Sequence, residues 1–183
     1  MQYTDSLKPI DLDEIKEASK DISAYRIFLH WSAGHYGQAY EDYHLNIDYN
    51  GRIYACDNDL DFDKKLEHTW HRNSGSIGIA MLGCYDAVAN AGHNCNFGSE
   101  PPTPAQIEAM ACAVAIICKY GNIPIDDVSV MTHCEIATED GYGPGSGDSE
   151  TRWDLWYLPD YDGVMKPGGQ VIRGKALWYY NYV

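Results

Sequence analysis

The chain has 183 residues, 45% of them apolar, and a formal net charge of −14. A chain of this length can bury a hydrophobic core within one domain, and this composition excludes a disordered protein. The Lys and Arg residues are scattered, so we expect neither a nucleic-acid partner nor adhesion to anionic membranes or wall polymers. We expect substrate recognition to come from a cleft.

Residues 1–20 are polar and acidic, and no stretch of the chain approaches the length of a membrane span. With no apolar run of signal-peptide length at the start, we expect a soluble protein, and we expect a monomer. The six cysteines follow no CxxC pattern. Cys84 and Cys95 flank one loop, and a disulfide between them is an alternative that the sequence leaves open, as it does the redox compartment.

The first half of the chain predicts one short helix and several strands. Residues 11–20 have the periodicity of an amphipathic helix, and residues 24–31 form an apolar run typical of a buried strand. That strand has His30 at its C-terminal end, which is where open sheets place ligands. The later strands are predicted at 43–48 and 52–56, joined by the hairpin signal Asn50-Gly51, and at 76–82 after a charged connection at 58–73.

The second half predicts a long loop, a helix and a second strand that ends at a histidine. The segments are a lid-like loop at 84–102, a helix from a cap at Thr103 to about residue 120, a strand at 128–132 followed by His133, an irregular loop at 140–147 and an aromatic helix at 170–183. Thr103 and Gln106 have the spacing of a capping box, with Pro104 in the first turn. This helix is the most clearly marked element of the chain.

Three side chains in distant parts of the chain have the donor types of a catalytic zinc site. His30 and His133 stand at the ends of two predicted strands, and Asp154 follows the glycine-rich loop. Zinc binds neutral imidazoles and anionic oxygens in a tetrahedral array, and three protein ligands leave one position for a water molecule whose pKa falls to about 7. The pattern therefore predicts a zinc hydrolase.

Short motifs follow one another in a characteristic order. They are His30-Trp31-Ser32-Ala33, Tyr43-His44-Leu45, Asp48-Tyr49-Asn50-Gly51, Ser76-Ile77-Gly78-Ile79, Thr103-Pro104-Ala105-Gln106 and His133-Cys134-Glu135-Ile136-Ala137. Over about residues 25–158 the chain resembles the N-acetylmuramoyl-L-alanine amidase family, which includes phage T7-type lysozyme, the AmpD-type amidases and the peptidoglycan recognition proteins. Each motif alone is weak, but their shared order is hard to obtain by chance.

The resemblance implies a zinc site made of His30, His133 and Asp154. The AmpD-type branch uses aspartate as the third ligand, whereas the T7-type branch and the recognition proteins use cysteine. A rival assignment would place Cys134 on the metal beside His133. We discount it because adjacent residues on a strand point to opposite faces.

The chain departs from the family at two positions. Ala80 stands where the AmpD-type branch has a catalytic glutamate, so that general base is absent. Tyr43 matches the tyrosine of the T7-type branch, and a phenol beside zinc can orient water and stabilise developing charge. Arg152 replaces the family's lysine; it can stabilise an oxyanion but is a poor proton donor. Tyr43 and Arg152 are the predicted catalytic residues.

Four residues are predicted to bind substrate. His71 resembles a pocket-wall position of the family, with an exposed loop histidine as the alternative. Trp31, Trp70 and Asn73 are expected to line a sugar or peptide groove, although tryptophan more often belongs to the core or its rim. Glu135 is expected near the second ligand, as a polar neighbour or as a partner that orients an imidazole.

We expect one α/β domain over residues 1–183, with a central mixed β-sheet of about five to six strands flanked by helices, the zinc site at one end of the sheet, and residues 159–183 as a C-terminal packing extension. The resemblance implies hydrolysis of the amide between the lactyl group of N-acetylmuramic acid and L-alanine in peptidoglycan. With no signal peptide in evidence, we expect a lytic enzyme that is released or injected onto the wall, such as a phage endolysin, a prophage remnant or an antibacterial effector. The alternatives are a non-catalytic peptidoglycan-binding module, a cytoplasmic wall-recycling enzyme, and another metal hydrolase, which would leave the motif order unexplained.

Overall fold

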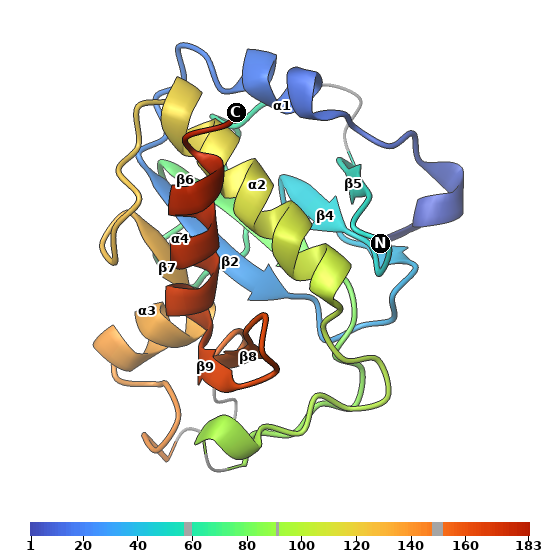
Figure 1. Cartoon of the computed structure of the whole chain (residues 1–183), viewed down its shortest axis with the longest axis vertical. Helices are drawn as coiled ribbons and strands as arrows, with labels where there is room; N and C mark the ends of the chain where they lie inside the picture. Colours follow the sequence, from blue (N-terminus) through green and yellow to red (C-terminus); the bar gives the residue numbers. More distant parts are fainter. Residues whose placement is uncertain (57–59, 91, 148–151) are drawn as a thin grey trace.

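The structure, a computed structural model, describes residues 1–56, 60–90, 92–147 and 152–183, so parts of the predicted connection at 58–73 and loop at 84–102 lie outside the described residues. Its strands are β1 (Gln2–Tyr3), β2 (Arg26–Trp31), β3 (Gln38–Ala39), β4 (Leu45–Ile47), β5 (Ile53–Tyr54), β6 (Ser76–Met81), β7 (Val130–Thr132), β8 (Tyr157–Pro159) and β9 (Met165–Pro167). Its helices are α1 (Leu12–Ala18), α2 (Pro104–Tyr120), α3 (His133–Glu139) and α4 (Gly168–Tyr179). Figure 1 shows α2 and α4 packed together over the sheet.

A five-stranded mixed sheet in the order β5-β4-β6-β2-β7 forms the centre of the fold. β4, β6, β2 and β7 run parallel, and β5 pairs antiparallel with β4. The turn between β4 and β5 contains Gly51 with a φ of 81°, which the predicted Asn50-Gly51 hairpin signal anticipates. The predicted α/β class and mixed sheet are confirmed.

The central strands are buried on both faces, and side-chain alternation divides their residues between two layers. Leu29 of β2 and Ile79 of β6 belong to the main hydrophobic core. Phe28 lies on the opposite face in a second cluster that includes Ile136 of α3. His30 shares the face of Phe28, because it lies two residues further along the same strand.

Helix α2 starts with the predicted capping box and is tied to the sheet by a buried glutamine. Thr103 Oγ1 accepts a hydrogen bond from Gln106 N at 3.1 Å, and Gln106 Oε1 accepts one from Thr103 N at 3.0 Å. The Gln106 amide also donates to the backbone carbonyls of Ile47 and Leu82, at 3.0 Å and 2.6 Å. This side chain therefore fixes α2 to β4 and to the end of β6.

Two parts of the fold differ from the prediction. Thr132 caps α3 with Glu135 as its capping-box partner, so His133 begins a helix instead of closing a strand. The spacing of Thr132 and Glu135 carries this signal in the sequence. The antiparallel hairpin of β8 and β9 was not predicted, because each strand has only three residues and its pattern is too short to detect.

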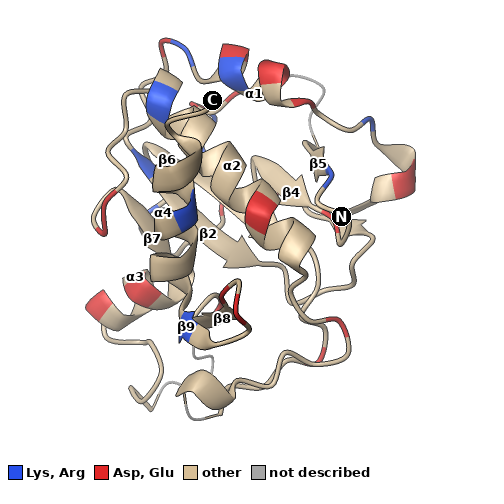
Figure 2. Ribbon diagram, in the orientation of Figure 1, with Lys and Arg blue, Asp and Glu red and all other residues tan. Residues whose placement is uncertain are grey.

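Charged side chains of both signs are interspersed along the elements (Figure 2). Lys175 of α4 pairs with Glu108 of α2 at 2.6 Å, and Lys20 pairs with Glu17 at the end of α1 at 2.6 Å. Within each pair the opposite charges neutralise one another. Within the described parts of the chain, no helix is both long enough and apolar enough to span a bilayer.

Candidate metal centre

The candidate site lies at the edge of the sheet where β2 and β7 end. The two strands run parallel, with Leu29 opposite Thr132, so the next residues, His30 and His133, come side by side. The C-terminal ends of parallel strands share one edge, which is where open sheets place their ligands. His30 is fully buried, and His133 is 8% exposed.

Asp154 comes from the segment that returns to this edge after the glycine-rich loop. Its backbone carbonyl accepts a hydrogen bond from Cys134 N at 3.2 Å, which fixes the segment to the first turn of α3. Leu155 follows with a φ of 60°, a conformation that costs energy for a residue other than glycine. A Cβ at Gly168 would lie 2.1 Å from the Leu155 carbonyl oxygen, so only glycine allows α4 to pack this closely on the turn.

The three side chains form a buried triangle of donor atoms. The Nδ1 atoms of His30 and His133 are 3.2 Å apart. His30 Nδ1 lies 3.0 Å from Asp154 Oδ2, and His133 Nδ1 lies 3.1 Å from Asp154 Oδ1. Tetrahedral zinc, with ligand bonds of about 2.0–2.1 Å, would set its ligands about 3.3 Å apart. The spacing and chemistry of these donors therefore fit a metal ion.

The electrostatics of the triangle favours the protonation states that bind metals. Burial acts to raise the pKa of Asp154, but the two histidines outweigh it and hold that pKa well below its usual range. Burial lowers the pKa of His30, and Asp154 only partly offsets this effect. A charged carboxylate and a neutral imidazole are the forms that a metal ion requires.

A further buried histidine, His68, contacts His30 on the side away from Asp154. Its Nδ1 lies 3.3 Å from His30 Nε2, and the two rings meet edge to face with their centroids 5.3 Å apart. His68 is not among the site residues predicted from the sequence. The one available signal was Gly78 inside an apolar strand, which marks a close approach. A Cβ at Gly78 would lie 2.7 Å from the His68 ring.

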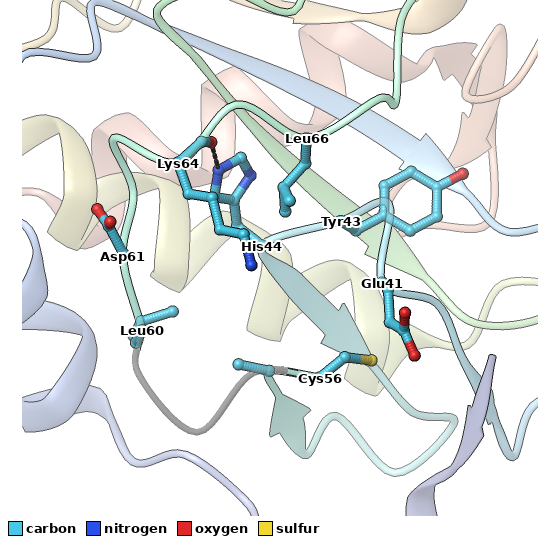
Figure 3. A pocket seen from close by; sticks show the side chains of 9 residues that line it. Glu41, Tyr43, His44, Cys56, Leu60, Asp61, Lys64 and Leu66 are labelled. Atoms are coloured by element: carbon cyan, nitrogen blue, oxygen red, sulfur yellow. Dashed lines mark hydrogen bonds between the residues drawn. The ribbon is translucent and has the colours of Figure 1, made fainter.

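Tyr43 lies against His30 from the segment before β4. The two ring centroids are 5.1 Å apart, with an angle of 42° between the planes. In Figure 3 the Tyr43 ring points away from His44, whose Nε2 lies 2.8 Å from the Lys64 carbonyl oxygen at the other end of the view. Burial raises the pKa of the Tyr43 phenol. The phenol therefore stays protonated at neutral pH and can donate a hydrogen bond.

Ala80 lies beside the triangle, and Arg152 precedes Asp154 by two residues in the chain. The pairing of β2 with β6 places Ala80 in register with His30, so a methyl group stands next to the first histidine. Arg152 is half-buried and starts the segment that leads to Asp154. Its charge is near enough to Tyr142, on the glycine-rich loop, to act on the pKa of that phenol. The catalytic roles of Tyr43 and Arg152 stay predictions.

Trp31, which was expected to line a groove, packs into the core. It is 5% exposed, and its ring meets that of Trp153 edge to face with the centroids 4.8 Å apart. Trp31 belongs to the main core because neighbouring residues on a strand face opposite sides, and His30 takes the other side. Its packing supports the strand and the segment that carry His30 and Asp154.

The other three predicted binding residues lie in one turn before β6. Trp70 is 63% exposed and meets Tyr142 edge to face at 5.6 Å. His71 is also exposed, with its ring centroid 4.1 Å from that of Trp70. Asn73 Oδ1 accepts a hydrogen bond from Thr69 N at 2.7 Å, so this side chain closes the turn. Trp70 is the best placed of the three to meet a ligand, and their binding roles stay predictions.

Two residues next to His133 differ from their expected surroundings. Cys134 lies on a helix, so the strand argument against it was wrong, but among the described residues the donor atoms that converge on one point are those of His30, His133 and Asp154, without the Cys134 thiol. Glu135 forms two hydrogen bonds with Arg173, both at 2.9 Å. It therefore braces α3 against α4 and does not orient an imidazole.

The cysteine pair that flanks the long loop does not form a bridge. Cys84 and Cys95 are free thiols, as are the other cysteines of the described residues. Burial raises the pKa of both thiols, which keeps them protonated. The disulfide that the spacing left open is therefore absent from this structure.

Residues 16–146 match the Amidase_2 family, N-acetylmuramoyl-L-alanine amidase. The matched range includes both histidines of the triangle and Tyr43, and it ends before Arg152 and Asp154. No curated protein sequence matches the chain.

Several solved structures resemble the chain at low identity. The endolysin N-acetylmuramoyl-L-alanine amidase LysCS from Clostridium intestinale URNW is 16% identical, with a TM-score of 0.42 and coverage of 73% of this chain and 76% of that one. The Ph2119 endolysin from Thermus scotoductus MAT2119 bacteriophage Ph2119 is 20% identical, with a TM-score of 0.44 and coverage of 63% and 75%. A complex of tracheal cytotoxin with the ectodomains of peptidoglycan recognition proteins LCa and LCx is 14% identical, with a TM-score of 0.45 and coverage of 73% of this chain and 78% of that one.

We predict that the metal-free protein loses stability as the pH falls below about 6.5. Burial lowers the pKa of His30 and His44, and it lowers that of His68 to about 2. In the unfolded chain the imidazoles bind protons below about pH 6.5, whereas in the folded chain these three stay neutral. The free energy of unfolding therefore falls by about 1.4 kcal/mol for each histidine with every pH unit below that value.

Urea denaturation in the presence of a chelator, between about pH 7 and about pH 5, measures this slope while most carboxylates stay ionised. His44→Gln should reduce the slope of unfolding free energy against pH by the contribution of one histidine, about 1.4 kcal/mol per pH unit. His93→Gln, at an exposed position of the long loop, is the control and should leave the slope unchanged. A stability that does not change with pH in this window would contradict the neutral, buried state of the histidines.

Proposed function

Because the chain belongs to the N-acetylmuramoyl-L-alanine amidase family, we propose that it hydrolyses the amide between the lactyl group of N-acetylmuramic acid and L-alanine in peptidoglycan. Water adds to the carbonyl carbon and the C–N bond breaks. The lactyl group becomes a carboxylate and stays on the sugar, and the amine of L-alanine departs and takes up a proton. The products are a glycan strand and a free stem peptide.

The observation that carries this proposal is the convergence of His30, His133 and Asp154. These side chains come from β2, from the start of α3 and from the segment after the glycine-rich loop, yet their donor atoms lie 3.0–3.2 Å apart. All three residues are buried. Burying two imidazoles and a carboxylate costs free energy, and a shared metal ion would offset that cost.

We propose that the bound ion is zinc, held by both Nδ1 atoms and by Asp154. When bound, zinc polarises a substrate carbonyl and lowers the pKa of a water molecule to about 7. The chain itself keeps the His30 imidazole neutral and the Asp154 carboxylate charged. It also fixes the two histidines where two parallel strands end, so little reorganisation is needed on metal binding.

Tyr43 is the proposed hydrogen-bond donor to the oxyanion. Its ring packs against His30, and its phenol is protonated at neutral pH. A donor directed at the atom where charge develops stabilises the transition state more than the ground state. Ala80 stands in register with His30 and offers no carboxylate there, whereas the Tyr43 ring packs against His30 and carries a phenol.

Arg152 is proposed to supply positive charge in addition to that of the zinc ion. It precedes Asp154 by two residues and is half-buried. Its guanidinium keeps its charge at any working pH and can pair with an oxyanion or with a carboxylate of the stem peptide. Proton transfer to the leaving amine is not assigned to Arg152 because a guanidinium is a poor acid.

The alternative function is a non-catalytic module that binds peptidoglycan. Ala80 is the observation that favours it, because a methyl group stands beside His30 where a general base would be expected. The buried triangle of donors favours the enzyme, since binding a wall fragment does not require it. A lytic role on intact wall is the setting that we propose for the enzyme.

We predict that the zinc-loaded protein releases stem peptides that begin with L-alanine from purified peptidoglycan, as read by mass spectrometry. His133→Ala should release none, because one donor of the triangle is gone. His93→Ala, which changes an exposed loop residue, is the matched control and should act like the wild type. Wall binding without release by a zinc-loaded wild type would support the recognition module.

We predict that Tyr43→Phe lowers kcat by about 100- to 1000-fold, because it removes one hydrogen bond to the developing oxyanion. The ring and its packing on His30 are kept, so zinc affinity should not change. Tyr179→Phe is the control, since its hydroxyl bonds to Glu108 at 2.9 Å, between α4 and α2. Steady-state kinetics on a soluble muropeptide measures both variants, and full activity of Tyr43→Phe would remove this residue from the mechanism.

A further inference from the structure

We infer that His68 is a positioning residue that holds His30 in the tautomer with an unprotonated Nδ1 facing His133 and Asp154. The inference rests on the proposed metal site. It concerns a residue outside the donor triangle, in the segment between β5 and β6. His68 is 6% exposed, so its imidazole is enclosed by the protein.

The contact between His30 and His68 determines which ring nitrogen of each imidazole carries the proton. His30 Nδ1 lies 3.2 Å from His133 Nδ1 and 3.0 Å from Asp154 Oδ2, so this nitrogen is the metal-facing one. A metal ligand nitrogen carries no proton, and a neutral imidazole has one, so His30 Nε2 must carry it. His68 Nδ1, at 3.3 Å, is positioned to accept the hydrogen bond from that N–H.

The next link fixes the tautomer of His68 as well. If His68 Nδ1 accepts, the proton of this imidazole lies on Nε2, which is 3.4 Å from Ser76 Oγ. Ser76 Oγ can then donate to the Asn73 carbonyl oxygen at 3.0 Å. A carbonyl oxygen only accepts, so the chain of bonds can run in one direction alone, from His30 to the backbone.

A second hydroxyl contacts the same nitrogen of His68. Thr69 Oγ1 lies 3.1 Å from His68 Nδ1. A hydroxyl can donate as well as accept, so this contact is compatible with an unprotonated Nδ1, whose single lone pair the Thr69 hydroxyl and the His30 N–H would then share. The direction of the contact with His30 is therefore set by His30 and Ser76.

Packing holds the His68 ring in place. A Cβ at Gly78 would lie 2.7 Å from this ring, so β6 approaches it as closely as a backbone can. Phe28 meets the ring edge to face, with the centroids 6.0 Å apart. A ring fixed in this way orients its partner, because it cannot turn its Nδ1 away from His30.

The two histidines of the triangle are not supported equally. His133 Nε2 is buried, and no hydrogen-bond partner for it occurs among the residues that the structure describes. His30 Nε2 has His68 as its partner. Outer partners of this kind raise ligand basicity and fix ring orientation. The tuning of the site by the protein is therefore concentrated on His30.

The test measures zinc affinity, by competition with a fluorescent chelator, for the wild type, His68→Phe and His68→Asn. Phenylalanine keeps the volume of the ring and removes the acceptor, whereas the Asn side-chain oxygen can take the place of Nδ1. His68→Phe should lose about 10- to 100-fold in affinity, and His68→Asn should stay within about threefold of the wild type.

His44→Phe is the matched control. It replaces a buried imidazole that contacts His68, with centroids 6.0 Å apart, and that bonds to Lys64 and Gly78. Circular dichroism gives the folded fraction of each variant, and affinity is expressed per folded molecule. His44→Phe removes these two hydrogen bonds but leaves the contact between His68 and His30 in place, so it should keep its zinc affinity.

A spectroscopic measurement reads the tautomers themselves. In long-range ¹H–¹⁵N spectra of the zinc-loaded protein, His30 and His68 should each carry their proton on Nε2. A proton on His68 Nδ1 overturns the inference. So does wild-type affinity in His68→Phe, or a loss in His68→Asn or His44→Phe that equals the loss in His68→Phe.

The outcome also separates this inference from the proposed function. A wild type that binds no zinc overturns both the metal site and the role of His68. A wild type that binds zinc and releases no stem peptide contradicts the proposed reaction alone, and the affinity comparison then still decides the role of His68.

Discussion

The parallel pairing of β2 with β7 is the constraint on which the rest of the structure depends. The register that sets Leu29 opposite Thr132 brings His30 beside His133. A slip of one residue would turn His30 toward the main core and Leu29 toward the site, because strand side chains alternate between faces. Asp154 completes the triangle only because its backbone bonds to the first turn of α3, directly after the same strand.

Polar groups at this edge are enclosed by protein, so their partners are part of the fold. His30 has Asp154 on one nitrogen and His68 on the other. Gly78 makes room for the second of these contacts. The site is thus built on the face of the sheet that carries Phe28 and His30, while Leu29 and its neighbours on the opposite face hold the main core together.

Short sequence patterns were enough to predict several elements of the fold and the position of His30. The cap at Thr103 and the apolar run that ends at His30 depend on a few neighbouring residues, so the sequence shows them directly. The grouping of His30 with Asp154 came from motif order and not from local pattern. His68 could not be predicted, because no local sequence pattern indicates which loop residue packs against Gly78. Trp31 was placed in a groove because its type suits both a core and a binding surface.

X-ray absorption at the zinc edge, with metal analysis of the same sample, tests whether His30, His133 and Asp154 hold zinc. We expect about one zinc ion per chain, with only nitrogen and oxygen neighbours at about 2.0–2.1 Å. A sulfur neighbour at about 2.3 Å, which Cys134 or another thiol would supply, would contradict the assignment of Asp154 as the third ligand. A folded protein that takes up no zinc would contradict the metal site altogether.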